Sequence, residues 1–101
     1  MSTSITRPRT ETKPETERPK VYKVILLNDD YTPREFVVMV LRAVFRMSTD
    51  QAHGVMLTAH MKGCCVVAVY TREVAETKAT QAIDMAAREG YPLMFTTEPE
   101  D

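Results

Sequence analysis

A short apolar run that ends at three polar residues is the feature that most limits what this chain can fold into. Val21–Leu27 has the sequence VYKVILL, and its β-branched and aliphatic side chains predict a first strand. Asn28, Asp29 and Asp30 follow directly, and short polar side chains of this kind favour a turn. An apolar pattern at helical spacing begins a few residues later. We therefore expect strands and helices to alternate, with a polar turn between the first strand and the first helix.

The first helix is predicted from start signals that agree with one another. Thr32 is expected to cap it, Pro33 suits its first position, and Glu35 completes a capping box. We expect this helix to run to about Arg46. Its apolar stripe consists of Phe36, Val37, Val40, Leu41 and Val44.

A second helix and a second strand come next. Ser48 and Gln51 form another capping box, and Gly63 suits the C-terminal cap of the helix that they open. Residues 64–70, with the sequence CCVVAVY, form a continuous apolar run. Such a run predicts a buried, central strand.

A third helix and a closing strand complete the pattern. Thr71 is expected to cap a helix that extends to about Glu89 and ends at Gly90. Residues 91–97 predict a short strand, and its proline suggests an edge position. The order β-α-α-β-α-β indicates an α/β sandwich, in which a three-stranded antiparallel sheet packs with one face against three helices.

Residues 1–20 differ in composition from the rest of the chain. Beyond the first methionine their one aliphatic residue is Ile5, and three prolines are interspersed among charges. Such a segment cannot bury enough apolar surface to offset the entropy of ordering. We therefore expect a flexible N-terminal tail, followed by a single domain over residues 21–101.

Composition and charge exclude several classes of protein. The chain carries 13 basic and 14 acidic residues, whereas a protein that coats nucleic acid normally has a basic excess. It lacks an apolar run of the roughly 20 residues that a membrane-spanning helix needs. Its first residues lack the apolar core of a secretory signal. These features predict a cytoplasmic protein that binds neither nucleic acid nor membrane.

The two cysteines, Cys64 and Cys65, are adjacent in the sequence. Neighbouring cysteines are poorly placed to close an unstrained disulfide or to share a zinc ion. Because they begin an apolar run, we expect small buried side chains in a reducing compartment.

Polar side chains of two segments are candidates for chemistry. Asn28, Asp29 and Asp30 form an ordinary turn sequence, but two carboxylates and an amide can also accept hydrogen bonds from a cation, a metal ion or an ammonium group. His60 lies one helical turn beyond Met56 and shares its face, and it is either a solvated residue near a helix end or a ligand residue.

An enzyme is the rival interpretation, as a small metal- or acyl-handling protein built on these carboxylates, His60 and a cysteine. The predicted strand would keep a buried thiol protonated and inert. The chain also lacks a serine in a nucleophile elbow and a glycine-rich phosphate loop. We therefore predict a protein that is not an enzyme and that uses neither a metal nor another cofactor.

Several blocks of sequence, in the right order, resemble the ClpS family over about residues 20–98. They are the segment YKVILLNDDYTP at 22–33 with EFV at 35–37, the pair Met56-Leu57 with His60, VYT at 69–71 with EVAETK at 73–78, and YPL at 91–93.

This resemblance implies an adaptor of the bacterial AAA+ protease ClpAP. Such adaptors bind proteins whose first residue is Phe, Tyr, Trp or Leu and deliver them for degradation. By the resemblance Asn28, Asp30 and His60 hold the free α-amino group, with Asp29 shaping the loop. The apolar pocket for the first side chain maps onto Thr32, Arg34, Val37, Met56, Ala59 and Leu93.

The resemblance also implies partner contacts and shows two departures. Glu73 and Lys78 map onto the surface that docks on the N-terminal domain of ClpA, and the tail assists handover to the unfoldase. Arg34 stands where the family usually has a pocket-gating methionine, and Ala59 where a valine is common. These departures predict a shifted ranking that favours aromatic first residues over Leu, because a guanidinium can stack on a ring. The alternative is a ClpS-like adaptor with altered or lost N-terminal specificity.

Overall fold

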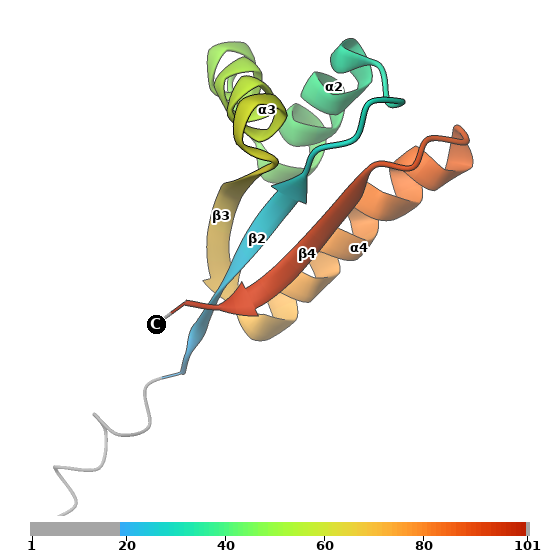
Figure 1. The fold of residues 1–101 in the computed structure, drawn as a ribbon. Coiled ribbons are helices and arrows are strands. Elements are labelled where there is room, and N and C mark those ends of the chain that lie inside the picture. Colours follow the sequence, from blue (N-terminus) through green and yellow to red (C-terminus); the bar gives the residue numbers. More distant parts are fainter. Residues whose placement is uncertain (1–18, 101) are drawn as a thin grey trace, which may run out of the picture.

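The computed structural model describes residues 19–100, so the predicted tail lies outside it except for its last two residues. The order of elements is the predicted one (Figure 1). The strands and helices are β2 (Val21–Leu27), α2 (Arg34–Phe45), α3 (Thr49–Lys62), β3 (Cys64–Thr71), α4 (Arg72–Arg88) and β4 (Met94–Pro99).

The three strands form one antiparallel sheet in the order β3-β2-β4. At the end of the sheet where β2 stops, Leu27 is paired with Cys64 on one side and Met94 on the other. The β2–β3 register shifts between Val24 and Ile25. As predicted, β4 is an edge strand, although it begins at Met94.

The prediction that residues 64–70 form the central strand is wrong. β2 holds that position, and β3 lies at an edge. The apolar run misleads because one face of the sheet is left open. Val66 and Val69 lie on that face, exposed by 46% and 41%. The cysteines are affected in the same way: Cys64 is exposed and Cys65 only half-buried, so the prediction of two buried thiols is wrong too.

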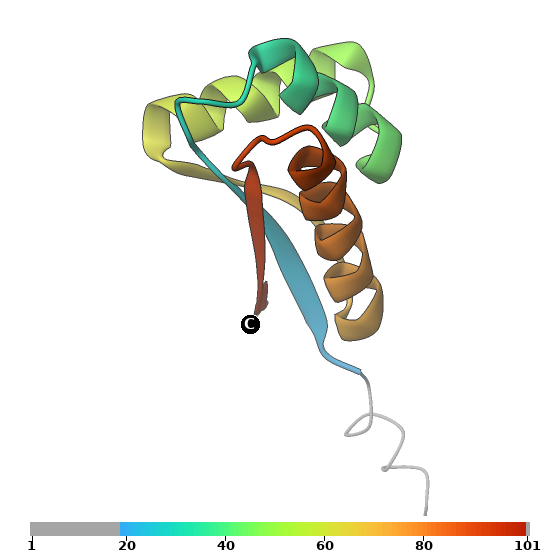
Figure 2. The ribbon, with the colours of Figure 1, turned by 90° about the vertical axis from the view of Figure 1, so that its right-hand side faces the viewer.

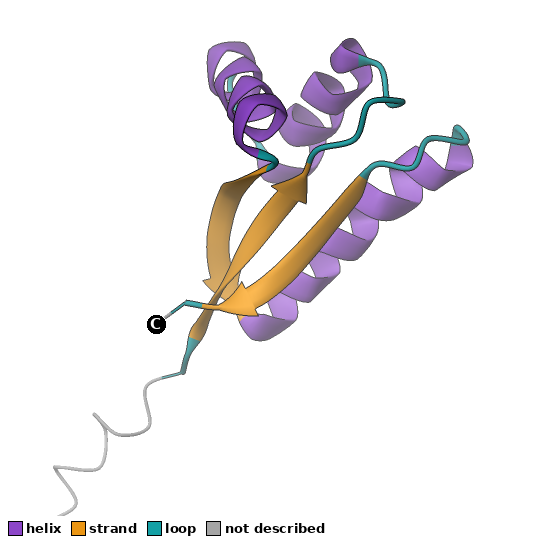
Figure 3. Cartoon of the chain, viewed as in Figure 1, coloured by secondary structure: helices purple, strands orange, loops and turns teal. Residues whose placement is uncertain are grey.

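The helices lie on one side and at one end of the sheet (Figures 1, 2 and 3). Helix α4 runs along one face, whereas α2 and α3 lie across the end where β2 stops and β3 begins. Four small buried side chains, Ala75, Ala79, Ala82 and Ala86, line the core side of α4. They let the helix approach the sheet closely.

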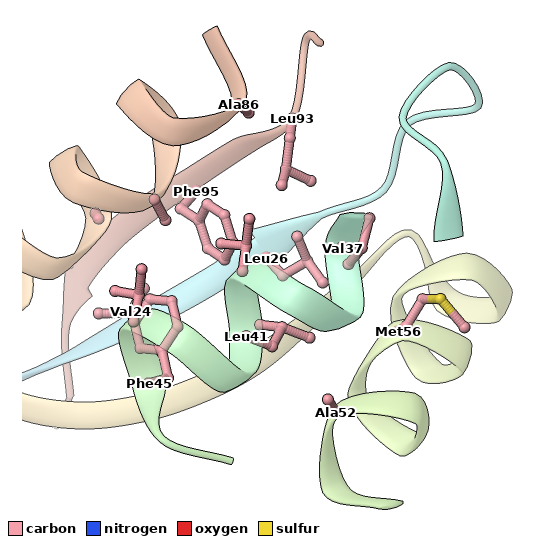
Figure 4. Close-up of a cluster of buried hydrophobic side chains, with 14 of the residues drawn as sticks. Val24, Leu26, Val37, Leu41, Phe45, Ala52, Met56, Ala86, Leu93 and Phe95 are labelled. Atoms are coloured by element: carbon pink, nitrogen blue, oxygen red, sulfur yellow. The ribbon is translucent and has the colours of Figure 1, made fainter. Parts of the chain in front are cut away.

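The core fills the space between these layers. Val24 and Leu26 point from the central strand toward Phe45 of α2 and Phe95 of β4 (Figure 4). The two phenylalanine rings lie 5.5 Å apart between centroids. Within residues 19–100, no helix is both long and apolar enough to cross a membrane.

The helix caps are predicted only in part. The box of Ser48 and Gln51 is present, with hydrogen bonds of 3.1 Å and 2.9 Å. Gly63 ends α3 with a left-handed φ of 92°, a conformation that a side chain disfavours. The predicted capping box of Thr32 is wrong, because α2 begins at Arg34 and the Thr32 hydroxyl bonds elsewhere.

Thr71 occupies the N-cap position of α4 as predicted. Within the part of the chain that the structure describes, however, its side chain makes no capping hydrogen bond.

Candidate functional site

The polar turn after β2 is held together by one carboxylate. Asp29 Oδ1 accepts hydrogen bonds from the backbone N–H groups of Tyr31 and Thr32, each at 2.8 Å. Its Oδ2 accepts a third from the Thr32 hydroxyl at 2.9 Å. Asp29 therefore organises the turn and leaves Asn28 and Asp30 exposed on either side of it.

A backbone contact ties this turn to the end of α3. The Asn28 N–H donates to the Gly63 carbonyl at 3.0 Å, directly after the last turn of that helix. His60 lies in that last turn. The polar turn and His60, far apart in the sequence, are thereby held together at the end of the sheet where β2 stops.

A cavity of about 220 Å³ opens between the turn, α2, α3 and the segment before β4. All ten residues that the sequence assigned to amine and side-chain binding line it: Asn28, Asp29, Asp30, Thr32, Arg34, Val37, Met56, Ala59, His60 and Leu93. Leu26, Leu27 and Leu57 also line it and were missed. The sequence pattern indicates only strand positions for Leu26 and Leu27, whereas Leu57 stands beside Met56 in one of the blocks that resemble the family.

The cavity has an apolar floor and a polar mouth. Val37, Met56, Ala59 and Leu93 are all buried, and they come from three separate segments. Figure 4 shows Val37, Met56 and Leu93. Asn28, Asp30, Arg34 and His60 are exposed. A ligand that carries an ammonium group next to an apolar side chain can satisfy both regions at once.

Comparisons with known proteins identify the family of the chain. Residues 17–96 match the family described as ATP-dependent Clp protease adaptor protein ClpS. The chain belongs to the ClpS family. It is 67% identical to ClpS 2 of Mesorhizobium japonicum over 96 residues, a match that covers 95% of each chain. It is 64% identical to ClpS 1 of Bradyrhizobium diazoefficiens over 101 residues, a match that covers 100% of each chain.

A solved structure shares both fold and sequence with the chain. It is Agrobacterium tumefaciens ClpS2 bound to L-phenylalaninamide, with a TM-score of 0.81 and 65% identity, covering 82% of this chain and 100% of that one. The family and the fold predicted from the sequence are thus confirmed. ClpS proteins are protease adaptors, so the chain is an adaptor and not an enzyme.

The two residues assigned to docking in this ClpS-family chain have different surroundings. Glu73 is exposed in the first turn of α4. The Lys78 ammonium is half-buried and donates to the Val44 carbonyl in the last turn of α2, at 3.0 Å. Both line a shallow groove with Val74, Thr77 and Gln81. Lys78 therefore joins two helices in addition to facing the groove.

Other sites for chemistry are poorly supported. Among residues 19–100, no group of three or more His, Cys, Asp or Glu side chains is placed to hold a metal ion. A larger hollow of about 530 Å³ lies between α3 and β3, beside Val55, Thr58 and Cys65. Of the residues that the structure describes, no carboxylate lines it, so it lacks acceptors suited to an ammonium group.

Proposed function

We propose that this adaptor binds proteins through a free N-terminal residue that is large and hydrophobic, and delivers them to the Clp protease through ClpA. The observation that carries the proposal is the cavity, in which an apolar floor and a mouth with a carboxylate, an amide and an imidazole lie side by side. This combination matches the two features that an N-terminal Phe, Tyr, Trp or Leu presents together.

The mouth suits an α-ammonium group. Such a group donates up to three hydrogen bonds, and Asn28, Asp30 and His60 offer three acceptors when the imidazole is neutral. The bond to a carboxylate is charge-assisted and is the strongest of the three. An internal residue has no ammonium group, so this mouth selects for the chain terminus.

The floor suits the first side chain. Burying a leucine or aromatic side chain among Val37, Met56 and Leu93 contributes about 1.5–3 kcal/mol. L-Phenylalaninamide, the ligand of the Agrobacterium relative, has a free α-amino group and a benzyl side chain, and it therefore carries both features. The alternative of lost specificity rests on Arg34 and Ala59 alone, whereas the mouth keeps all of its acceptors.

Delivery requires a second surface. We assign it to the α4 groove that contains Glu73 and Lys78, which lies on another element than the cavity, so a loaded adaptor can dock on the N-terminal domain of ClpA. Residues 1–20 would assist handover to the unfoldase. Two free thiols, one of them exposed, fit a reducing compartment, and we place the adaptor in the cytoplasm.

Degradation of reporter proteins by ClpAP tests the proposal. Reporters that differ only in a first residue of Phe, Leu or Ser are incubated with protease, with and without the adaptor. We expect the adaptor to accelerate loss of the Phe and Leu reporters and to leave the Ser reporter unchanged. Equal acceleration of all three would contradict N-terminal recognition. Glu73→Gln serves as the matched docking variant, which should bind peptide normally but deliver it poorly.

A further inference from the structure

The two most exposed large apolar side chains of residues 19–100 are both direct sequence neighbours of residues that line the cavity. Tyr31 is 81% exposed and Met61 79%, whereas the next large hydrophobic residue, Val66 or Met94, reaches 46%. Tyr31 lies between Asp30 and Thr32, and Met61 follows His60; these three neighbours all line the cavity. Scattered exposed hydrophobic residues are ordinary, but a cluster at the rim of a binding site marks an interaction surface.

Leu57 connects Met61 to the cavity. The two residues are four positions apart on α3, so they share one face of the helix. Leu57 is 44% exposed and itself lines the cavity. An apolar strip therefore continues from the mouth along the outside of α3, and Tyr31 lies in the polar turn between two residues that line the same cavity. We call Tyr31, Leu57 and Met61 the apolar rim.

A peptide bound as proposed must leave across this mouth. Its ammonium group is held by Asp30 and His60 and its first side chain fills the floor, so the residues that follow continue out of the cavity past its rim. The strip from Leu57 to Met61 spans about 6 Å of helix. Two residues of an extended peptide span about 7 Å. The lengths match.

We propose that the apolar rim is a subsite for the two residues that follow the N-terminal one, and that it favours apolar side chains there. This inference rests on the proposed function and extends it from the first residue to the next two. The rim is continuous with the cavity, which favours the substrate over another occupant. Its side chains are aromatic, aliphatic and thioether, and all three gain by contact with apolar groups.

Peptide binding measured by fluorescence anisotropy tests the inference. One labelled peptide begins Phe-Leu-Leu, a second begins Phe-Ser-Ser, and a third begins Phe-Ser-Ser and carries both leucines near its other end. We expect the first to bind roughly fivefold more tightly than the other two, because it buries apolar surface on the rim. In the double variant Tyr31→Ser/Met61→Ser that advantage should fall below twofold, with unchanged binding of the second peptide.

Matched controls separate the possible failures. Met39→Ser removes an exposed methionine of α2 that is 42% exposed and outside the cavity lining, and it should keep the full advantage. Equal binding of all three peptides would overturn the inference, as would an advantage that survives in the double variant. The inference would also be overturned if the parent protein showed no preference among the peptides and the double variant lost ClpA binding. The rim would then bind the unfoldase. If the Phe-Ser-Ser peptide binds equally well when acetylated, the proposed function itself fails.

Discussion

Asp29 and Thr32 are joined twice: the Asp29 carboxylate accepts the Thr32 backbone N–H at 2.8 Å through one oxygen and the Thr32 hydroxyl at 2.9 Å through the other. Because Thr32 is buried and lines the cavity, this pair fixes the turn against the apolar floor. It thereby sets the position of the neighbouring Asn28 and Asp30 before a ligand arrives.

The double contact predicts that a variant of Asp29 weakens binding through the shape of the turn. Asp29→Ala removes all three hydrogen bonds of the turn and should lower peptide affinity by about tenfold or more, since a polar group left without its partner costs about 1–3 kcal/mol. Thr32→Val removes only the hydroxyl bond and should have a smaller effect. Anisotropy titration measures both affinities. Equal affinity of the parent protein and Asp29→Ala would show that the turn does not depend on this carboxylate.

Arg34 at the cavity mouth predicts a ranking among first residues. Its guanidinium is exposed beside the mouth, where it can stack on an aromatic ring but gains little from a leucine. We expect Phe-initiated peptides to bind more tightly than Leu-initiated ones, and Arg34→Met to reduce the difference by a factor of about 3–5. Titrations of the Phe- and Leu-initiated peptides against the parent protein and Arg34→Met give the four dissociation constants. A difference that Arg34→Met leaves unchanged would rule out stacking as its cause.

Lys78 predicts a change in stability that Glu73 does not. Its ammonium donates to the Val44 carbonyl at the end of α2, where the helix dipole also favours a positive charge. Because Lys78 is only half-buried, Lys78→Met should lower the free energy of unfolding by about 1 kcal/mol. Lys78→Arg should lose less of this free energy of unfolding, and Glu73→Gln should leave the free energy of unfolding unchanged. Urea denaturation measures all three. If Lys78→Met were as stable as the parent protein, the contact with Val44 would not contribute to stability. The role left for Lys78 would then be docking on ClpA.

The adjacent thiols should differ in reactivity. Burial, and secondarily the nearby Cys64, raise the pKa of the Cys65 thiol. A raised pKa leaves less thiolate at a given pH below it, and the thiolate is the reactive form. At pH 8 we therefore expect iodoacetamide to modify Cys64 faster than Cys65. Mass spectrometry of Cys64→Ser and Cys65→Ser proteins resolves the two rates. Faster modification of Cys65 would place its side chain in water, contrary to the structure.

The order of elements follows from local sequence patterns, whereas the residues that the structure brings together in the cavity were named for another reason. Val21–Leu27, the Ser48–Gln51 box and Gly63 are local features whose physical effect does not depend on the rest of the fold. The set of cavity residues, from Asn28 to Leu93, came from resemblance to the family. Local patterns alone would have made Met56 and Leu93 simple core residues.

The predictions fail where the structure depends on a contact with a distant residue, or where one side chain has two possible partners. Residues 64–70 look the same whether one or two strands pair with them and whether the outer face of the sheet is covered or open, so neither their edge position nor their exposure could be inferred. Thr32 could cap α2 or bond to Asp29, and the sequence does not say which acceptor it chooses. The contact between Lys78 and Val44 joins residues that are 34 positions apart, beyond the reach of any local pattern.

Binding of a Phe-initiated peptide with a free or an acetylated N-terminus tests the central claim most directly. We expect the free amine to bind and the acetylated peptide to lose at least about 100-fold in affinity, because acetylation removes the charge and two donors that the carboxylate, amide and imidazole accept. In Asp30→Ala the affinity for the free amine should also collapse, and in His60→Ala it should fall by about 5- to 100-fold, with both proteins folded like the parent. Equal binding of the two peptides by the parent protein would contradict the account, because the cavity would then be an apolar groove that does not recognise the chain terminus.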